Sequence, residues 1–162
     1  MDDFDRALRE AAARTGGRAQ LDLEVLRYHP TLLAELRPVL DALLDNAADA
    51  LDIAERPEGT IRVVARDCDG RLRLTVTDDG CGMARDIRVR RLAAFRTPGR
   101  RAGEPGLATV HRIVVQRFAG LMFVRSRPGE GTTVHIELPI PAANDRRWQI
   151  TAEQIARVKG AA

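Results

Sequence analysis

Two stretches in the middle of the chain place a polar side chain where it could bind a ligand. In "LLDNAADALD", Asn46 lies among Leu43, Leu44, Ala47 and Ala50, which recur at helical spacing. An amide oxygen on such a helix can ligate a hard cation such as Mg²⁺, which prefers oxygen ligands. The alternative is an asparagine that forms a hydrogen bond at the edge of the core.

In "TVTDDGCGM", a strand rich in β-branched residues ends at Asp78, and Gly80 and Gly82 follow. Glycines let the backbone turn tightly and approach a flat ligand. A carboxylate at the end of a strand can accept a hydrogen bond from an amino group such as that of adenine. A solvent-facing Asp-Gly turn is the alternative.

Two further stretches combine glycine turns with the start of an element. "GEPGLATV" (103–110) is predicted to enter a helix, where free backbone N–H groups and the helix dipole favour phosphates. "PGEGTTVHIELP" (128–139) is predicted to turn into a strand with the hydroxyl of Thr132 near the sheet end. Alone, each also fits an ordinary helix start or hairpin turn.

The periodicities around these stretches predict the elements that must position them. Pro38 is expected in the first turn of the central helix, and 84–106 is expected to be a long, lid-like loop with a short helix near 89–94. The predicted elements are a helix at 2–15, a strand at 19–26, a helix at 36–51, paired strands at 60–67 and 71–78, a helix at 107–120, and paired strands from 121 to 139.

This order predicts an α/β two-layer sandwich, with a mixed, mostly antiparallel sheet and helices on one face. We expect residues 1–140 to form one domain and 141–162 to be a tail with a short helix from Thr151, where Thr151 and Gln154 fit a capping box.

The composition excludes several classes of protein. With 162 residues, 44% hydrophobic and 30% charged, the chain is predicted to be a soluble single domain. Its net charge of +3 comes without basic tracts interleaved with aromatics, so no nucleic-acid partner is expected. Cys68 and Cys81 form no metal or disulfide pattern. The sequence has no signal peptide or transmembrane run, so a cytoplasmic location is expected.

Taken together and in this order, the four stretches resemble the histidine-kinase-type ATPase (GHKL) family, which is shared with gyrase and the mismatch-repair ATPases. The resemblance covers about residues 19–139 and is strongest to the ATP-binding domain of sensor histidine kinases, on "LRPVLDALLDNAADALD" and "FRTP…GLATVHRIV". It implies the Bergerat-type sandwich of that family, with ATP and Mg²⁺ as ligands.

The resemblance implies a role for residues at the adenine end of the site. Asp78 would accept the adenine amino group, with a water shared by Thr132. Gly80, Gly82 and Met83 belong to the turn that would shape the adenine pocket.

At the phosphate end, Asn46 would hold Mg²⁺ against the triphosphate. Gly106 and Leu107 would approach the phosphates, and Asp49, one turn after Asn46, would line the pocket.

Around the phosphates, the sequence also departs from the family pattern. Ala42 stands where kinases of the family have Asn and gyrase-like members have a Glu base, so efficient activation of water is not expected. Glu104 and Pro105 replace residues of a glycine turn, adding a negative charge and removing a backbone donor. Arg100 and Arg101 could reach phosphate oxygens, or they could belong to a solvated loop.

The chain also lacks an evident phosphoacceptor. His29, His111 and His135 are its histidines, and structural roles are expected for all three. If the domain is an active kinase, it would phosphorylate a histidine on another domain or chain. Two alternatives remain open. One is a non-catalytic module that binds a signalling partner such as a response regulator. The other is a stand-alone serine kinase like the anti-sigma factors.

Overall fold

The computed structural model of the chain describes residues 3–23, 30–87 and 106–139. The short helix expected near 89–94 and the tail at 141–162 lie outside these residues. None of the described helices is long and apolar enough to cross a membrane.

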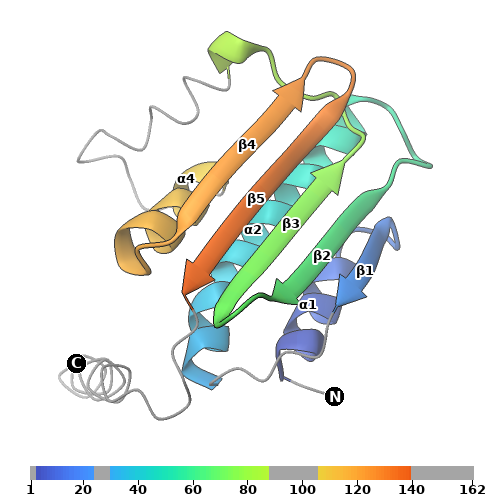
Figure 1. Cartoon of the computed structure of the whole chain (residues 1–162). Coiled ribbons are helices and arrows are strands. Elements are labelled where there is room, and N and C mark those ends of the chain that lie inside the picture. The colour runs from blue at the N-terminus through green and yellow to red at the C-terminus, as the bar shows by residue number, and fades with distance from the viewer. Residues whose placement is uncertain (1–2, 24–29, 88–105, 140–162) are drawn as a thin grey trace, which may run out of the picture.

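The described residues form two layers (Figure 1). The front layer is a five-stranded sheet in the order β1-β2-β3-β5-β4, in which β1 and β2 are parallel and all other neighbours are antiparallel. The strands are β1 (Ala19–Leu23), β2 (Ile61–Asp67), β3 (Arg71–Asp78), β4 (Leu121–Arg127) and β5 (Gly131–Pro139). The mixed, mostly antiparallel sheet predicted from the sequence is therefore confirmed.

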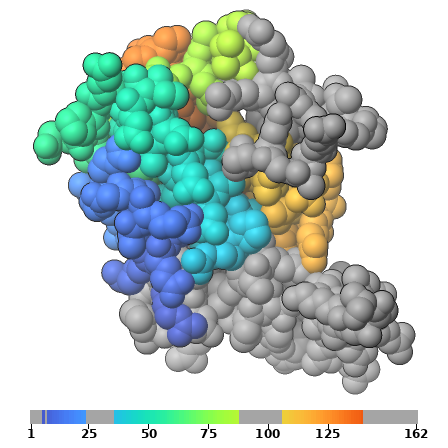
Figure 2. All heavy atoms as spheres, turned by 180° about the vertical axis from the view of Figure 1, so that it is seen from behind, coloured from blue at the N-terminus to red at the C-terminus, as the bar shows by residue number. Residues whose placement is uncertain are grey.

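The second layer covers one face of the sheet and is helical (Figure 1). It consists of α1 (Asp3–Ala13), α2 (Pro30–Ile53), α4 (Leu107–His111) and the π-helical turn η2 (Arg112–Arg117), which continues α4. Seen from behind, α2 lies between α1 and the α4–η2 segment (Figure 2). The long helix α2 thus forms the middle of the second layer.

The helix α2 corrects one expectation. It begins at Pro30, so Pro38 lies inside the helix instead of in its first turn. A proline fits the first helical position at residue 30, where its missing N–H would have no partner. At residue 38 the ring removes one hydrogen bond of the helix, and the apolar face offsets that loss: Leu36, Val39, Leu40, Leu43, Leu44, Ala47 and Leu51 are all buried.

The core lies between this helix face and the inner face of the sheet. The strands alternate buried and exposed residues, as a half-buried sheet requires, and the antiparallel register places their buried side chains together. The buried apolar residues of β2, β3 and β5, the three central strands, are Ile61, Val63, Ala65, Leu72, Leu74, Val76, Val134, Ile136 and Leu138.

The turns confirm two predicted boundaries. Between β2 and β3, Asp69 and Gly70 have φ values of 53° and 76°, as a two-residue hairpin turn of the primed type requires. After η2, the N–H of Gly120 donates to the carbonyl of Val114 at 2.8 Å. A Cβ at Gly120 would lie 2.6 Å from the carbonyl oxygen of Glu137, so only glycine fits where the helix meets β5.

Candidate functional site

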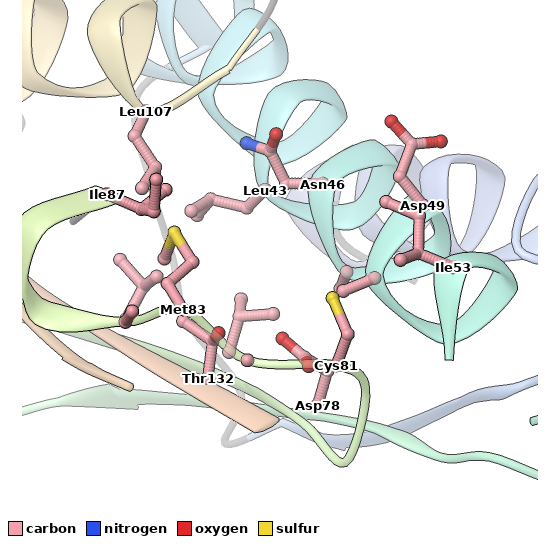
Figure 3. Close-up of a pocket in the computed structure, with 16 residues that line it drawn as sticks. Leu43, Asn46, Asp49, Ile53, Asp78, Cys81, Met83, Ile87, Leu107 and Thr132 are labelled. Carbon is pink, nitrogen blue, oxygen red and sulfur yellow. The ribbon is translucent and has the colours of Figure 1, made fainter. Parts of the chain in front are cut away.

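A cavity of about 250 Å³ opens between α2 and the inner face of the sheet, where β3 ends and β5 begins (Figure 3). The start of α4 and the segment after β3 complete its walls. Seven of the predicted site residues line it, namely Asn46, Asp49, Asp78, Gly82, Met83, Leu107 and Thr132. The remaining two, Gly80 and Gly106, do not line the cavity, but each lies next to a residue that does, namely Asp78 and Asn46 respectively.

Asp78 forms one polar end of the cavity. Its side chain is buried, with 7% exposed, and one carboxylate oxygen accepts the backbone N–H of Gly80 at 2.9 Å. Burial raises the pKa of the Asp78 carboxyl, while hydrogen bonds from the backbone N–H groups of Gly80 and Thr132 act in the opposite direction. A buried acceptor of this kind suits a ligand that brings an N–H donor.

Two glycines let the chain after Asp78 fit between α2 and the β4–β5 turn. A Cβ at Gly80 would lie 2.6 Å from the backbone of Ala50, and a Cβ at Gly82 would overlap the carbonyl of Arg127. The N–H of Cys81 donates to the Ala50 carbonyl at 2.9 Å, and its carbonyl accepts the N–H of Gly129 at 2.8 Å. The turn is therefore bonded on both sides.

Thr132 lies opposite Asp78 in the β3–β5 register, and its hydroxyl belongs to a small network. Its oxygen is 2.8 Å from Ser126 Oγ, which also accepts the N–H of Met83 at 2.8 Å and donates to the carbonyl of Gly131 at 3.1 Å. Ser126 was not predicted as a site residue. The available signal was its position in β4, where strand alternation places this polar residue on the same face as Met122 and Val124.

Asn46 forms the second polar end of the cavity. Its amide nitrogen is buried and has no hydrogen-bond partner among the described residues. Gly106, with φ of 138°, lies beside it, since a Cβ there would come within 3.4 Å of the amide oxygen. A buried polar atom without a partner costs about 1–3 kcal/mol, so this amide fits a bound group better than it fits an empty core.

Apolar side chains line the space between the two polar ends. Leu43 and Ile53 come from α2, Met83 and Ile87 follow β3, and Leu107 begins α4 (Figure 3). Ile53 is 71% exposed and Ile87 38% exposed, which is unusual for large apolar residues and marks the mouth of the cavity. The lining therefore suits a flat, largely apolar ring whose polar edge meets Asp78.

The acidic residues of α2 contribute little to this cavity. Asp49 lines its rim, but its carboxylate points away from Asp78 and Thr132 (Figure 3). Asp41 and Asp45 accept hydrogen bonds from Arg14, the residue that follows α1, at 2.9 and 3.3 Å. Ala42 is buried in the core with 6% exposed. Asp49 is therefore the acidic residue that α2 contributes to the lining of this cavity.

Several expectations fall outside the described residues, namely those on His29, Arg100, Arg101, Glu104 and Pro105. The other two histidines belong to elements of the fold. His111 ends α4 and is half-buried. His135 lies on β5, where its ring nitrogen is 3.0 Å from the hydroxyl of Thr75.

Comparison with known proteins decides the family. The family model described as "Histidine kinase-, DNA gyrase B-, and HSP90-like ATPase" matches residues 32–142, which is more than half of the chain. The chain belongs to this ATPase family. Within it, the described fold is the α/β sandwich of the histidine-kinase ATP-binding domains, so both the predicted family and the predicted fold class are confirmed.

Individual relatives agree with this assignment. The sensor histidine kinase AruS of Pseudomonas aeruginosa is 33% identical over 129 residues, which cover 76% of this chain and 13% of AruS. The histidine kinase domain of the Erythrobacter litoralis blue-light-activated kinase EL346 has a TM-score of 0.62 at 21% identity, covering 85% of this chain and 59% of that one. Full-length ShkA, whose crystal structure is a complex with AMPPNP, has a TM-score of 0.60 at 25% identity, covering 86% of this chain and 30% of that one.

The glycine turn of this ATPase domain can be tested by a matched pair of variants. Gly82 and Gly70 both have positive φ, at 62° and 76°, but only Gly82 has backbone where a Cβ would lie. Gly70→Ala should cost the left-handed backbone penalty of about 1–2 kcal/mol, and Gly82→Ala should cost clearly more. Urea denaturation measures both. Equal losses of unfolding free energy would show that the turn is not tightly packed.

The buried carboxylate of Asp78 predicts a pH dependence of stability. Its pKa is raised in the folded state, so its contribution is fully present below the unfolded pKa of about 3.9 and is lost as pH rises through the folded pKa. Wild type should therefore lose stability relative to Asp78→Asn above pH 4, by at most about 1.4 kcal/mol per pH unit. Urea denaturation of both proteins from about pH 3 to about pH 7, a range that begins below the unfolded pKa, tests this, and a constant difference over that range contradicts it.

Proposed function

We propose that this domain binds Mg-ATP in the cavity between α2 and the β3–β5 end of the sheet. The observation that carries the proposal is the spacing of polar groups in an apolar cavity. A buried carboxylate lies at one end, and an amide whose buried nitrogen has no hydrogen-bond partner among the described residues lies at the other. An adenine nucleotide has a donor amino group on a flat ring and oxygen-rich phosphates, which match these two ends in turn.

The chain's own residues would hold the base as follows. The adenine amino group donates to Asp78, whose position is fixed by the N–H of Gly80. The Thr132 hydroxyl accepts from the same edge of the base, directly or through a water. Leu43, Met83 and the other apolar side chains of the lining cover the faces of the ring and exclude water.

At the other end, Asn46 would supply one oxygen to a Mg²⁺ that is otherwise held by phosphate oxygens and water, as this ion prefers. When bound, the ion supplies neutralisation of the phosphate charge. The described residues contain no group of three or more His, Cys, Asp or Glu side chains that could hold a metal ion, so the phosphates and water would supply most of its ligands. Gly106 and Leu107 would lie against the phosphates, and Asp49 would remain at the rim.

We further propose that the domain, comprising residues 1–140, works as the ATP-binding part of a histidine kinase system in the cytoplasm, where ATP is available. It would position the γ-phosphoryl group for transfer to a histidine on another domain or chain. The relatives named above are histidine kinases, and the chain spans a small part of AruS. A response regulator would then be a downstream partner.

A second candidate is a module that binds nucleotide or a signalling partner without catalysis. The buried Ala42 favours it, because no side chain at this position can accept a proton or ligate a metal. Slow ATP hydrolysis is therefore expected for both candidates. Transfer of the γ-phosphoryl group to a histidine distinguishes them, because only the kinase domain would carry it out.

Calorimetric titration with Mg-ATP tests the nucleotide proposal, with Asp78→Asn as the variant and Asp79→Asn as its neighbour control. Asp79 accepts the N–H of Thr60 and does not line the cavity. Losing a hydrogen bond to a charged group should weaken binding about 10- to 100-fold in Asp78→Asn, with little change in Asp79→Asn. Absence of binding by wild type at millimolar ATP would overturn the proposal.

The role of Asn46 predicts a change in metal dependence. Wild type should bind ATP more tightly with Mg²⁺ than with EDTA, while Asn46→Ala should bind with about equal affinity in both, because it lacks the amide oxygen proposed to ligate the ion. The same calorimetry measures all four affinities. A variant that keeps the full benefit of Mg²⁺ would show that Asn46 is not the ligand.

A further inference from the structure

Ser126 occupies an unusual place for a residue of an edge strand. It lies in β4, directly opposite Thr132 of β5, on the strand face that points toward the helices. Its hydroxyl is half-buried, and the groups within hydrogen-bond distance of it include the N–H of Met83, the carbonyl of Gly131 and the hydroxyl of Thr132. The segment after β3 and the start of β5 therefore meet at one oxygen atom of β4.

Counting protons fixes the direction of these hydrogen bonds. A serine hydroxyl has one proton and two acceptor positions. The Met83 N–H can only donate, so it takes one acceptor position, and the Gly131 carbonyl can only accept, so it takes the proton. The Thr132 hydroxyl must then donate to Ser126 for all three contacts to be hydrogen bonds.

The consequence for the cavity is that Thr132 presents lone pairs and no proton. Asp78, its partner across β3 and β5, presents a carboxylate. The base-binding end of the cavity is thus lined by two acceptors side by side. A ring edge that carries an amino group can donate to it, whereas a ring edge that carries a carbonyl brings a third acceptor.

We propose that Ser126 is a positioning residue that sets the base selectivity of this site, by holding the Thr132 hydroxyl in its acceptor orientation. The inference depends on the nucleotide proposal above and adds the reason why a 6-aminopurine is preferred to a 6-oxopurine. A 6-oxopurine could donate its ring N1–H to Asp78, but its carbonyl would then meet the lone pairs of Thr132. Without Ser126, the Thr132 hydroxyl can rotate and donate to that carbonyl.

Competition between ATP and inosine triphosphate, which differ at position 6 of the purine, tests the role of Ser126. Calorimetry with both nucleotides would be done on wild type, on Ser126→Ala, and on Ser126→Thr, which keeps a hydroxyl at the same place. In Ser126→Ala, the preference for ATP should fall by about tenfold or more, mainly through tighter binding of inosine triphosphate. Ser126→Thr should keep the wild-type preference.

The outcomes separate the two proposals. If wild type binds neither nucleotide, the proposed function fails and this inference fails with it. If wild type binds ATP but Ser126→Ala keeps the wild-type preference, the selectivity role of Ser126 is wrong while the proposed function stands. Equal weakening of both nucleotides in Ser126→Ala would also overturn it, since that pattern marks a purely structural contact.

Discussion

The turn from Gly80 to Gly82 is the contact on which the rest of the site depends. It passes between the backbone of Ala50 in α2 and the carbonyl of Arg127 at the end of β4, at separations that leave no room for a Cβ. Hydrogen bonds from Cys81 to Ala50 and from Gly129 to Cys81 hold it on both sides. Because this turn bonds α2 to the end of the sheet at β3, it determines where Asp78 and Met83 lie in the cavity.

The buried polar groups of the cavity lower the stability of the folded domain, whereas the apolar residues of the core raise it. Asp78 is a carboxylate in a buried position with a raised pKa, and the buried amide nitrogen of Asn46 has no partner within the part of the chain that the structure describes. Both would be more stable in contact with water or with a ligand. Their persistence at opposite ends of an otherwise apolar lining is the physical argument for a bound molecule that carries a donor at one end and polar oxygens at the other.

Much of the fold follows from patterns in the sequence, because strand alternation and helical periodicity report which faces are buried. The two hairpins and the sheet with helices on one face were predictable in this way, whereas the gathering of Asn46, Asp78 and Thr132 in one site was expected from the resemblance to the ATPase family. The start of α2 was not, because the rule that proline belongs to a first turn could apply to Pro30 or to Pro38, and tertiary packing tolerates the second inside the helix.

Ser126 illustrates a different limit. Its role depends on Met83, which lies 43 residues away in the sequence, and on Gly131 and Thr132 of its own hairpin. The register of β4 on β5 brings Thr132 opposite Ser126, so these groups meet at one oxygen atom. Asp41 and Asp45 show the same limit. Helical geometry alone indicates that their side chains point away from Asn46, but only the packing of α1 on α2 reveals Arg14 as their hydrogen-bond partner.

The central claim, that an adenine nucleotide binds between α2 and the β3–β5 end of the sheet, is tested most directly by methyl NMR of the methionines. The chain has three methionines, of which Met83 lines the cavity and Met122 packs against the core elsewhere. With the ε-methyl groups labelled and Met83 assigned through Met83→Leu, saturating Mg-ATP should shift the Met83 signal and leave Met122 nearly unchanged. An unshifted Met83 signal at saturation would contradict the account.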